Sequence, residues 1–407
     1  MTTELHPSAS AHPKFLALRH APGVVAYLDC SSLVRSARSG AEGSALNTHA
    51  RLVRPRSRLP LMMSWSSGPQ LPKTAKRCKK TVADVIRHLV IFATPLETYR
   101  RPEAYFMMSR TTFDHFQALE VEVEETSIFL RRFGSGPAVL LLHGFPQTHL
   151  MWRSMAPSLA RRFTVICADL RGYGRSGCPT SRSDHAPYTK RAMAKDMVSV
   201  MEKLGFPRFS VGGHDRGGRV AYRLALDHPE RVERLAVLDV LPIADAWERA
   251  DKKLAISYWP WSLLAQPEPL PERLVSGAPD AVVDNALGGW GSPANAFSQE
   301  VREAYIDVLR DPARVHAICE EYRAAATLDH EHDAEDRRAG RQIACPILVL
   351  WSGRGPLNSW YAAEGGPLAL WRSWANDVRG GPLDAGHFFP EELPQRTAEE
   401  LSAFFAA

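Results

Sequence analysis

An aspartate occupies the position of a nucleophile in the segment Gly213–Gly218, which reads GHDRGG. An apolar run precedes this segment and a helical pattern follows it, so small residues flank Asp215 on a tight strand-to-helix turn. A carboxylate is suited to attack a saturated carbon and expel a leaving group. Water can then open the resulting ester at the enzyme's own carboxyl carbon. The pattern predicts covalent catalysis by Asp215.

Two later residues supply the partners that such a nucleophile needs. Asp239 ends the next apolar run, and His387 lies near the C-terminus. Taken singly, Asp239 could cap a strand end and His387 could be a hydrogen-bonded loop histidine. Together they follow the order nucleophile, acid, histidine of α/β-hydrolases. We expect His387 to activate water and Asp239 to orient its imidazole. The backbone N–H groups of Phe145 and Arg216 are the expected oxyanion donors.

Two arginines, Arg216 and Arg219, lie within one helical turn of the nucleophile. Guanidinium groups at such a place are costly unless they meet an anion, and their forked donors suit a carboxylate. The alternative for each is a structural salt bridge. The run Asp329–Asp333 resembles a metal site, but it continues into further charges, which favours a solvated helix face and no metal. No glycine-rich nucleotide loop follows the first core strand.

Short apolar runs that alternate with helical patterns position these residues. Such runs are typical of a mostly parallel sheet covered on both faces, which is a doubly wound α/β fold. Two alternating segments before them, Ala118–Glu124 and Thr126–Phe133, predict an antiparallel hairpin. The expected core strands are Ala138–Leu142, Phe163–Ala168, Phe209–Gly212, Leu235–Leu238 and Ile347–Trp351, and the expected helices include Tyr188–Leu204 and Gly217–His228.

About 100 residues, 242–342, separate the fourth and fifth core strands and show no strand pattern. A loop of that length without structure is uncommon, so we expect an inserted helical cap. In an open α/β sheet the ligand lies at the carboxyl ends of the strands, where this cap would exclude water. The predicted domains are therefore a core of residues 108–241 and 343–407 and a cap of residues 242–342.

Charge is distributed unevenly in this chain of 407 residues, whose formal net charge is +5. Residues 1–110 hold 17 Lys and Arg against 6 Asp and Glu, whereas residues 111–407 hold 33 against 39. We interpret residues 1–107 as a basic, disordered extension in which only residues 82–92 could form a helix. A targeting segment and a misassigned start at Met107 or Met108 are the alternatives, and we favour the misassigned start.

The bulk features exclude several classes of protein. The composition, 45% apolar and 23% charged, is that of a globular protein. Six cysteines without a C-x-x-C pair indicate buried thiols rather than a disulfide framework. The sequence contains no run of about 18 apolar residues, so we predict no helix that crosses a membrane. A basic tail alone does not indicate nucleic-acid binding. We therefore expect a cytoplasmic enzyme.

Three motifs give the chain a specific resemblance. The runs His143–Gln147 (HGFPQ), Asp169–Gly174 (DLRGYG) and Gly213–Arg219 (GHDRGGR) resemble those of haloacetate dehalogenases, including fluoroacetate dehalogenase. The resemblance covers about residues 110–405. It implies an α/β-hydrolase fold with a cap, no cofactor, a 2-haloacid substrate and a possible homodimer. By position, it also implies the nucleophile, acid and base named above, and a pair of carboxylate-binding arginines, Arg216 and Arg219.

The resemblance also implies halide-binding residues, and here the chain departs from the family. The family holds the leaving halide with His, Trp and a cap Tyr. Trp261 and Tyr322 match two of them, but Pro260 replaces the His in the run YWPW. Proline has no side-chain donor and no backbone N–H. We therefore expect chloro-, bromo- and iodoacetate to be preferred over fluoroacetate.

These expectations amount to hydrolytic dehalogenation of small 2-haloacids, from haloacetate to glycolate and halide, through an aspartyl ester. An epoxide hydrolase with the same Asp215 nucleophile is the main alternative. It would need cap tyrosines and no arginine pair. A non-catalytic ligand-binding relative is a further alternative, against which the complete set of Asp215, Asp239 and His387 argues.

Overall fold

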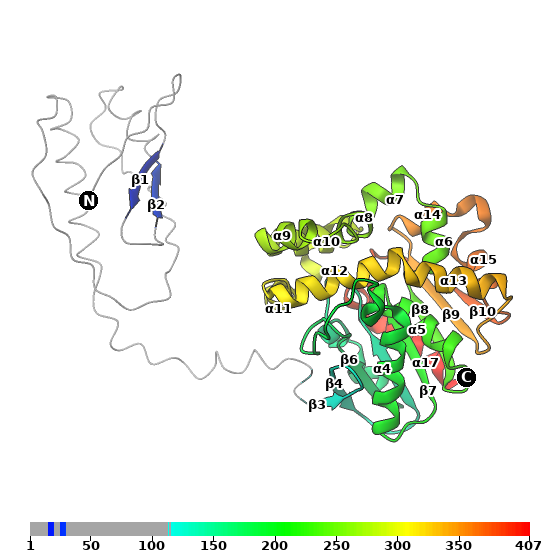
Figure 1. The fold of residues 1–407 in the computed structure, drawn as a ribbon. Helices are drawn as coiled ribbons and strands as arrows, with labels where there is room; N and C mark the ends of the chain where they lie inside the picture. Colours follow the sequence, from blue (N-terminus) through cyan, green and yellow to red (C-terminus); the bar gives the residue numbers. More distant parts are fainter. Residues whose placement is uncertain (1–14, 20–24, 30–112, 114) are drawn as a thin grey trace, which may run out of the picture. The chain divides into compact units, whose positions relative to one another are not determined.

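The computed structural model describes residues 15–19, 25–29, 113 and 115–407 (Figure 1). In the first of two compact units, strands β1 (Phe15–Arg19) and β2 (Val25–Asp29) form an antiparallel pair. Residues 1–107 were expected to be a disordered extension, so these two strands differ from the expectation. The possible helix over residues 82–92 and the two candidate start methionines lie outside the described residues.

The second unit is built on a mostly parallel sheet, in the order β10-β9-β8-β7-β5-β6-β4-β3. Strands β3 and β4 form the predicted antiparallel hairpin, and the remaining strands are parallel to one another. The strands are β3 (Gln117–Glu122), β4 (Ser127–Phe133), β5 (Ala138–Leu142), β6 (Thr164–Ala168), β7 (Phe209–His214), β8 (Val232–Leu238), β9 (Ile347–Ser352) and β10 (Val378–Leu383). The predicted doubly wound α/β architecture is confirmed.

Strand β10 was not predicted, and its composition explains why. It reads VRGGPL, and glycine and proline are depleted in strands. Gly380 has φ +144°, and a Cβ built on it would lie 1.8 Å from the carbonyl oxygen of Val349. Since β10 is an edge strand, it needs only one hydrogen-bonded neighbour, which makes Pro382 acceptable.

Successive side chains of the central strands point to two different apolar cores. Leu140 and Leu142 belong to the core that α4 (Lys190–Lys203) and α5 (Arg216–Asp227) cover. Val139 and Leu141 belong to the core on the opposite face, which α17 (Pro394–Ala406) covers. Because both faces are buried, the strand reads as a continuous apolar run. The remaining helices of the core are η2 (His149–Trp152), α3 (Ala156–Leu159), η3 (Ala186–Tyr188), α14 (Leu357–Trp360), η5 (Ala362–Glu364), α15 (Gly366–Arg372) and α16 (Phe389–Glu392).

Between β8 and β9 the chain forms helices and no strand, as predicted, and several of these helices lie above the sheet in Figure 1. We call this part the cap segment. Its elements are α6 (Ile243–Glu248), α7 (Lys252–Ser257), α8 (Trp259–Leu264), α9 (Leu270–Gly277), α10 (Pro279–Gly289), η4 (Ala294–Ala296), α11 (Gln299–Leu309), α12 (Pro312–Ala326) and α13 (Leu328–Arg338).

The predicted solvated face of α13 (Leu328–Arg338) is present at Glu331 and Glu335, which are exposed, but the prediction is wrong for the aspartates of the run. Asp329, Asp333 and Asp336 are buried, at spacings that place them on one side of the helix. Arg223 of α5 pairs with Asp333 at 2.6 Å and also with Asp336, and Lys190 pairs with Asp329. The charges that suggested solvent exposure instead attach the cap segment to the core. Among the described residues, no helix is both long and apolar enough to cross a membrane.

Candidate active site

Asp215 stands alone between β7 and α5, in a backbone conformation that few side chains adopt. Its φ is +44° and its ψ is −116°. The turn is possible because glycines lie two residues before and two residues after Asp215: a Cβ on Gly213 would lie 2.3 Å from the carbonyl oxygen of Gly217. A Cβ on Gly217 would lie 2.3 Å from that of Leu142. Such strain is typical of a residue held in place for function.

The carboxyl group of Asp215 is buried and ionised. Its Oδ2 accepts a hydrogen bond from the N–H of Phe145 at 3.1 Å, the first of the two expected oxyanion donors. The second, the N–H of Arg216, follows in the chain as the first residue of α5. Burial alone would raise the pKa of Asp215, but the positive charges of His387, Arg216 and Arg219 outweigh it and hold that pKa below its ordinary value.

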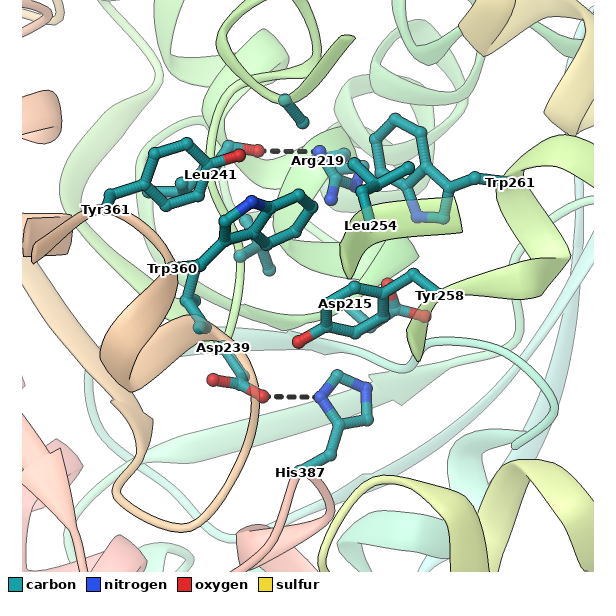
Figure 2. Close-up of a pocket in the computed structure, with 13 residues that line it drawn as sticks. Asp215, Arg219, Asp239, Leu241, Leu254, Tyr258, Trp261, Trp360, Tyr361 and His387 are labelled. Atoms are coloured by element: carbon teal, nitrogen blue, oxygen red, sulfur yellow. Dashed lines mark hydrogen bonds and ion pairs between the residues drawn. The ribbon is translucent and has the colours of Figure 1, made fainter. Parts of the chain in front are cut away.

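His387 and Asp239 form a close pair in the same region (Figure 2). The Nδ1 of His387 lies 2.5 Å from Oδ2 of Asp239, and a carboxylate can only accept, so Nδ1 carries the proton. The N–H of Ser352 donates to the other carboxylate oxygen at 2.9 Å. Burial would lower the pKa of His387, but the hydrogen bond and charge of Asp239 raise it. Its Nε2 is buried, and no described residue bonds to it.

His214, just before the nucleophile, was not predicted to take part. Its Nε2 donates to the carbonyl oxygen of His387 at 2.9 Å, and the two rings are 4.5 Å apart. Burial, and then the charge of His387, lower the pKa of His214 to about 3. It is therefore a neutral donor that fixes the loop of the base. Its position beside Asp215 was the only signal in the sequence.

The two arginines have different environments. Arg219 lines the cavity beside Asp215 (Figure 2). Its Nη1 donates to the carbonyl oxygen of Leu241 at 2.6 Å, and its guanidinium lies 4.3 Å from the Trp261 ring. Arg216 is fully buried and makes a salt bridge with Glu321 of α12. The alternative considered for each arginine, a structural ion pair, is what Arg216 forms, and Glu321 was not predicted.

A small cavity of about 30 Å³ collects most of these groups. One side is polar, with Asp215, Asp239, His387 and Arg219. The other side is apolar and aromatic, from the cap segment and α14. Its residues are Val240, Leu241, Ala246, Leu254, Tyr258, Trp261, Leu357, Trp360 and Tyr361.

Of the two expected halide-binding residues, one lines this cavity and the other does not. Trp261 lines it, but Tyr322 is not among the lining residues and instead packs 4.0 Å from the Arg216 guanidinium. Pro260 is buried in α8, next to Trp261. Tyr258 was quoted only as part of a motif, yet it lines the cavity and stacks on Trp360 with ring centres 5.6 Å apart.

Comparisons with known proteins agree with this geometry. The family described as alpha/beta hydrolase fold matches residues 137–392. A fluoroacetate dehalogenase from a Burkholderia species is 44% identical over 72% of this chain and 95% of its own length. A soluble epoxide hydrolase from a Corynebacterium species is 32% identical over 67% of this chain and 91% of its own length.

Solved structures give the same result. A putative alpha/beta hydrolase from Nostoc sp. PCC 7120 is 46% identical, with a TM-score of 0.69 over 72% of this chain and 98% of that one. A putative epoxide hydrolase from Pseudomonas aeruginosa is 42% identical, with a TM-score of 0.68 over 72% of this chain and 96% of that one. This chain therefore belongs to the α/β-hydrolase family, and within it to the family of the fluoroacetate dehalogenases.

Proposed function

We propose that the protein hydrolyses the carbon–halogen bond of small 2-haloacids, and that haloacetate is converted to glycolate, halide and a proton. The observation that carries the proposal is the shared cavity of Asp215, Arg219 and His387. An ionised carboxylate, a buried cation and an imidazole nitrogen without a partner there supply a nucleophile, an anion-binding group and a base.

The proposed reaction has two steps. A carboxylate oxygen of Asp215 attacks the α-carbon, and the carbon–halogen bond breaks with its electron pair on the halide, which leaves toward Trp261. His387 then takes a proton from water as the water attacks the carboxyl carbon of Asp215. The N–H groups of Phe145 and Arg216 stabilise the oxyanion that forms. The bond between the carboxyl carbon and the glycolate oxygen then breaks, that oxygen takes the proton back from His387, and Asp215 loses the remaining proton of the water to become a carboxylate again.

Single turnover in heavy-oxygen water tests this mechanism. Excess enzyme is incubated with chloroacetate, and both glycolate and the peptide containing Asp215 are analysed by mass spectrometry. Because water attacks the enzyme's carboxyl carbon, the label is expected in Asp215 and not in glycolate. The variant Asp215→Asn is the control and should release no chloride. Label that appears directly in glycolate contradicts the aspartyl ester.

We propose further that fluoroacetate is a poorer substrate than chloro-, bromo- or iodoacetate. Pro260 supports this preference, since it provides no donor beside Trp261. Fluoride needs the most stabilisation as it departs, because its charge is the most concentrated. Fluoride and chloride release are to be compared with one enzyme preparation, and faster defluorination contradicts the preference.

One observation favours a second candidate, an epoxide hydrolase. Tyr258 lines the same cavity as Asp215, and burial with the charges of Asp239 and Asp215 raises its pKa well above the ordinary value. It therefore remains protonated and could donate to an epoxide oxygen. Turnover of a small neutral epoxide that falls in Tyr258→Phe, without halide release from any haloacetate, would favour this candidate. Binding of ligands without turnover of either substrate class would favour a non-catalytic relative.

A further inference from the structure

One edge of the Arg216 guanidinium is occupied by a carboxylate of the protein. Its Nε lies 2.9 Å from both Oε1 and Oε2 of Glu321, and its Nη2 also donates to Oε1. The remaining nitrogen, Nη1, is buried, and no described residue bonds to it. A charged donor left in this state costs free energy unless a ligand takes its hydrogens. Glu321 therefore binds one edge of the Arg216 guanidinium, while Nη1 has no partner among the described residues.

Glu321 is itself held by the core of the protein. Lys190, in the first turn of α4, pairs with Oε1, and the hydroxyl of Tyr173 lies 3.4 Å from Oε2. Lys190 also pairs with Asp329 of α13. Burial would raise the pKa of Glu321, but the charges of Arg216 and Lys190 lower it, so it is an anion. Its position is fixed from the core and from its own helix.

The ring of Tyr322, the next residue of α12, lies 4.0 Å from the guanidinium carbon of Arg216. Glu321 therefore confines the guanidinium along one edge, and Tyr322 confines it over one face. A purely structural ion pair would be expected to satisfy every nitrogen of a fully buried arginine. Nη1 has no partner among the described residues, and the guanidinium carbon lies 5.5 Å from the ring of Trp261, which lines the cavity, so this donor is near the place where a ligand would bind.

We propose that Glu321 is a positioning residue of the substrate-carboxylate site: it fixes Arg216 side-on, so that Nη1 is presented to the substrate carboxylate while Arg219 supplies the uncompensated charge. This inference rests on the proposed function. The two arginines are then unequal. Glu321 neutralises Arg216, which acts as a directional donor, whereas Arg219 bonds only to a backbone carbonyl among the described residues. The acid substrate is thereby distinguished from a neutral one by geometry as well as by charge.

The variant Glu321→Gln tests the inference, with Glu320→Gln as the matched control. Glu320 lies on the same helix and pairs with Arg323 and His185, away from the cavity. In Glu321→Gln, we expect the dissociation constant of acetate, measured by calorimetry, to rise about 10- to 100-fold. KM for chloroacetate should rise by the same factor with kcat within about threefold, because a carboxylate contact is made equally in the ground and transition states. Glu320→Gln should change neither.

Two outcomes overturn the inference. The first is a folded Glu321→Gln that binds acetate as the wild type does, and the second is a fall in kcat with KM unchanged. If Glu321→Gln does not fold, Glu321→Asp keeps the buried charge but retracts the carboxylate by one methylene. Wild-type acetate affinity in Glu321→Asp also refutes the inference. A wild type that binds acetate but releases no halide contradicts the proposed function alone, since the acetate measurements still test Glu321.

Discussion

Replacing His387 by asparagine should stop the proposed reaction halfway. The imidazole lines the cavity with its Nε2 buried and without a partner among the described residues, and its Nδ1 is bound to Asp239. Asparagine removes the base, and with it one charge that lowers the pKa of Asp215, but it leaves Arg216 and Arg219 in place to hold that pKa down. Halide displacement needs no base, because the attacking carboxylate is already ionised. Opening of the ester does need one, so His387→Asn should accumulate the aspartyl ester.

The size of the effect follows from the role of the histidine. General-base catalysis contributes about 100- to 10,000-fold to a step, which corresponds to roughly 3–5 kcal/mol of activation free energy. The short bond to Asp239 places His387 at the upper part of this range, since the carboxylate both orients the ring and stabilises the imidazolium. We expect ester opening to slow by about 1,000-fold or more, while the first chloride is released at nearly the wild-type rate.

Rapid mixing with chloroacetate measures both parts. His387→Asn should give a burst of one chloride per active site and then almost none, and the intact protein should gain the mass of a carboxymethyl group on Asp215. His185→Asn is the matched control: His185 pairs with Glu320 outside the cavity, and its loss should leave steady turnover unchanged. The reasoning is refuted if His387→Asn releases no chloride burst, or if it turns over at the wild-type rate.

Three further predictions follow from the same geometry. First, kcat should fall as pH falls through the raised pKa of His387, because the base must be neutral. Asp239→Asn removes the negative charge that raises this pKa, so the fall in kcat should occur at lower pH in a pH–rate profile. Second, Pro260→His should raise fluoride release about 10- to 100-fold by supplying a donor, and a fluoride-to-chloride ratio equal to that of the wild type contradicts this. Third, in Gly144→Ala the new Cβ would lie 2.5 Å from that of the nucleophile, so kcat/KM should drop about 100-fold. Gly277→Ala, where a Cβ meets nothing within 4 Å, is the control for thermal unfolding and chloride release.

The parallel core could be predicted because its strands are buried on both faces. β5 and β6 are apolar throughout, so their sequences stand out from the helices around them. β10 could not be predicted, since close approach to β9 requires glycine at position 380 where a strand normally has a large side chain. The burial of Asp333 was missed for a similar reason: a buried aspartate and a solvated one have the same letter, and only its partner Arg223 separates them.

The candidate catalytic residues stand out in the sequence more clearly than the residues that contact them. Asp215, Asp239 and His387 are marked by strand ends and chain order, and the structure brings all three to one cavity. Nothing in the local sequence joins Glu321 to Arg216, because the contact spans 105 positions along the chain. His214 was adjacent to the nucleophile, but its bond to the base loop depends on how distant segments meet. Sequence patterns show reactive groups; tertiary contacts determine their orientation.

The same cations would serve the nucleophile and the substrate. Residues 111–407 carry an excess of acidic groups, so attraction of an anion must arise locally. Burial works against ionisation of Asp215, and the charges of His387, Arg216 and Arg219 overcome it. A substrate carboxylate that binds to Arg219 brings a second negative charge near Asp215 and favours its protonation. A buried carboxylate nucleophile that acts on an acid therefore needs more positive charge than one that acts on a neutral epoxide. Arg216 lowers the pKa of Asp215 even though it pairs with Glu321, so Arg216 and His387 still oppose protonation of the nucleophile once the acid has bound to Arg219.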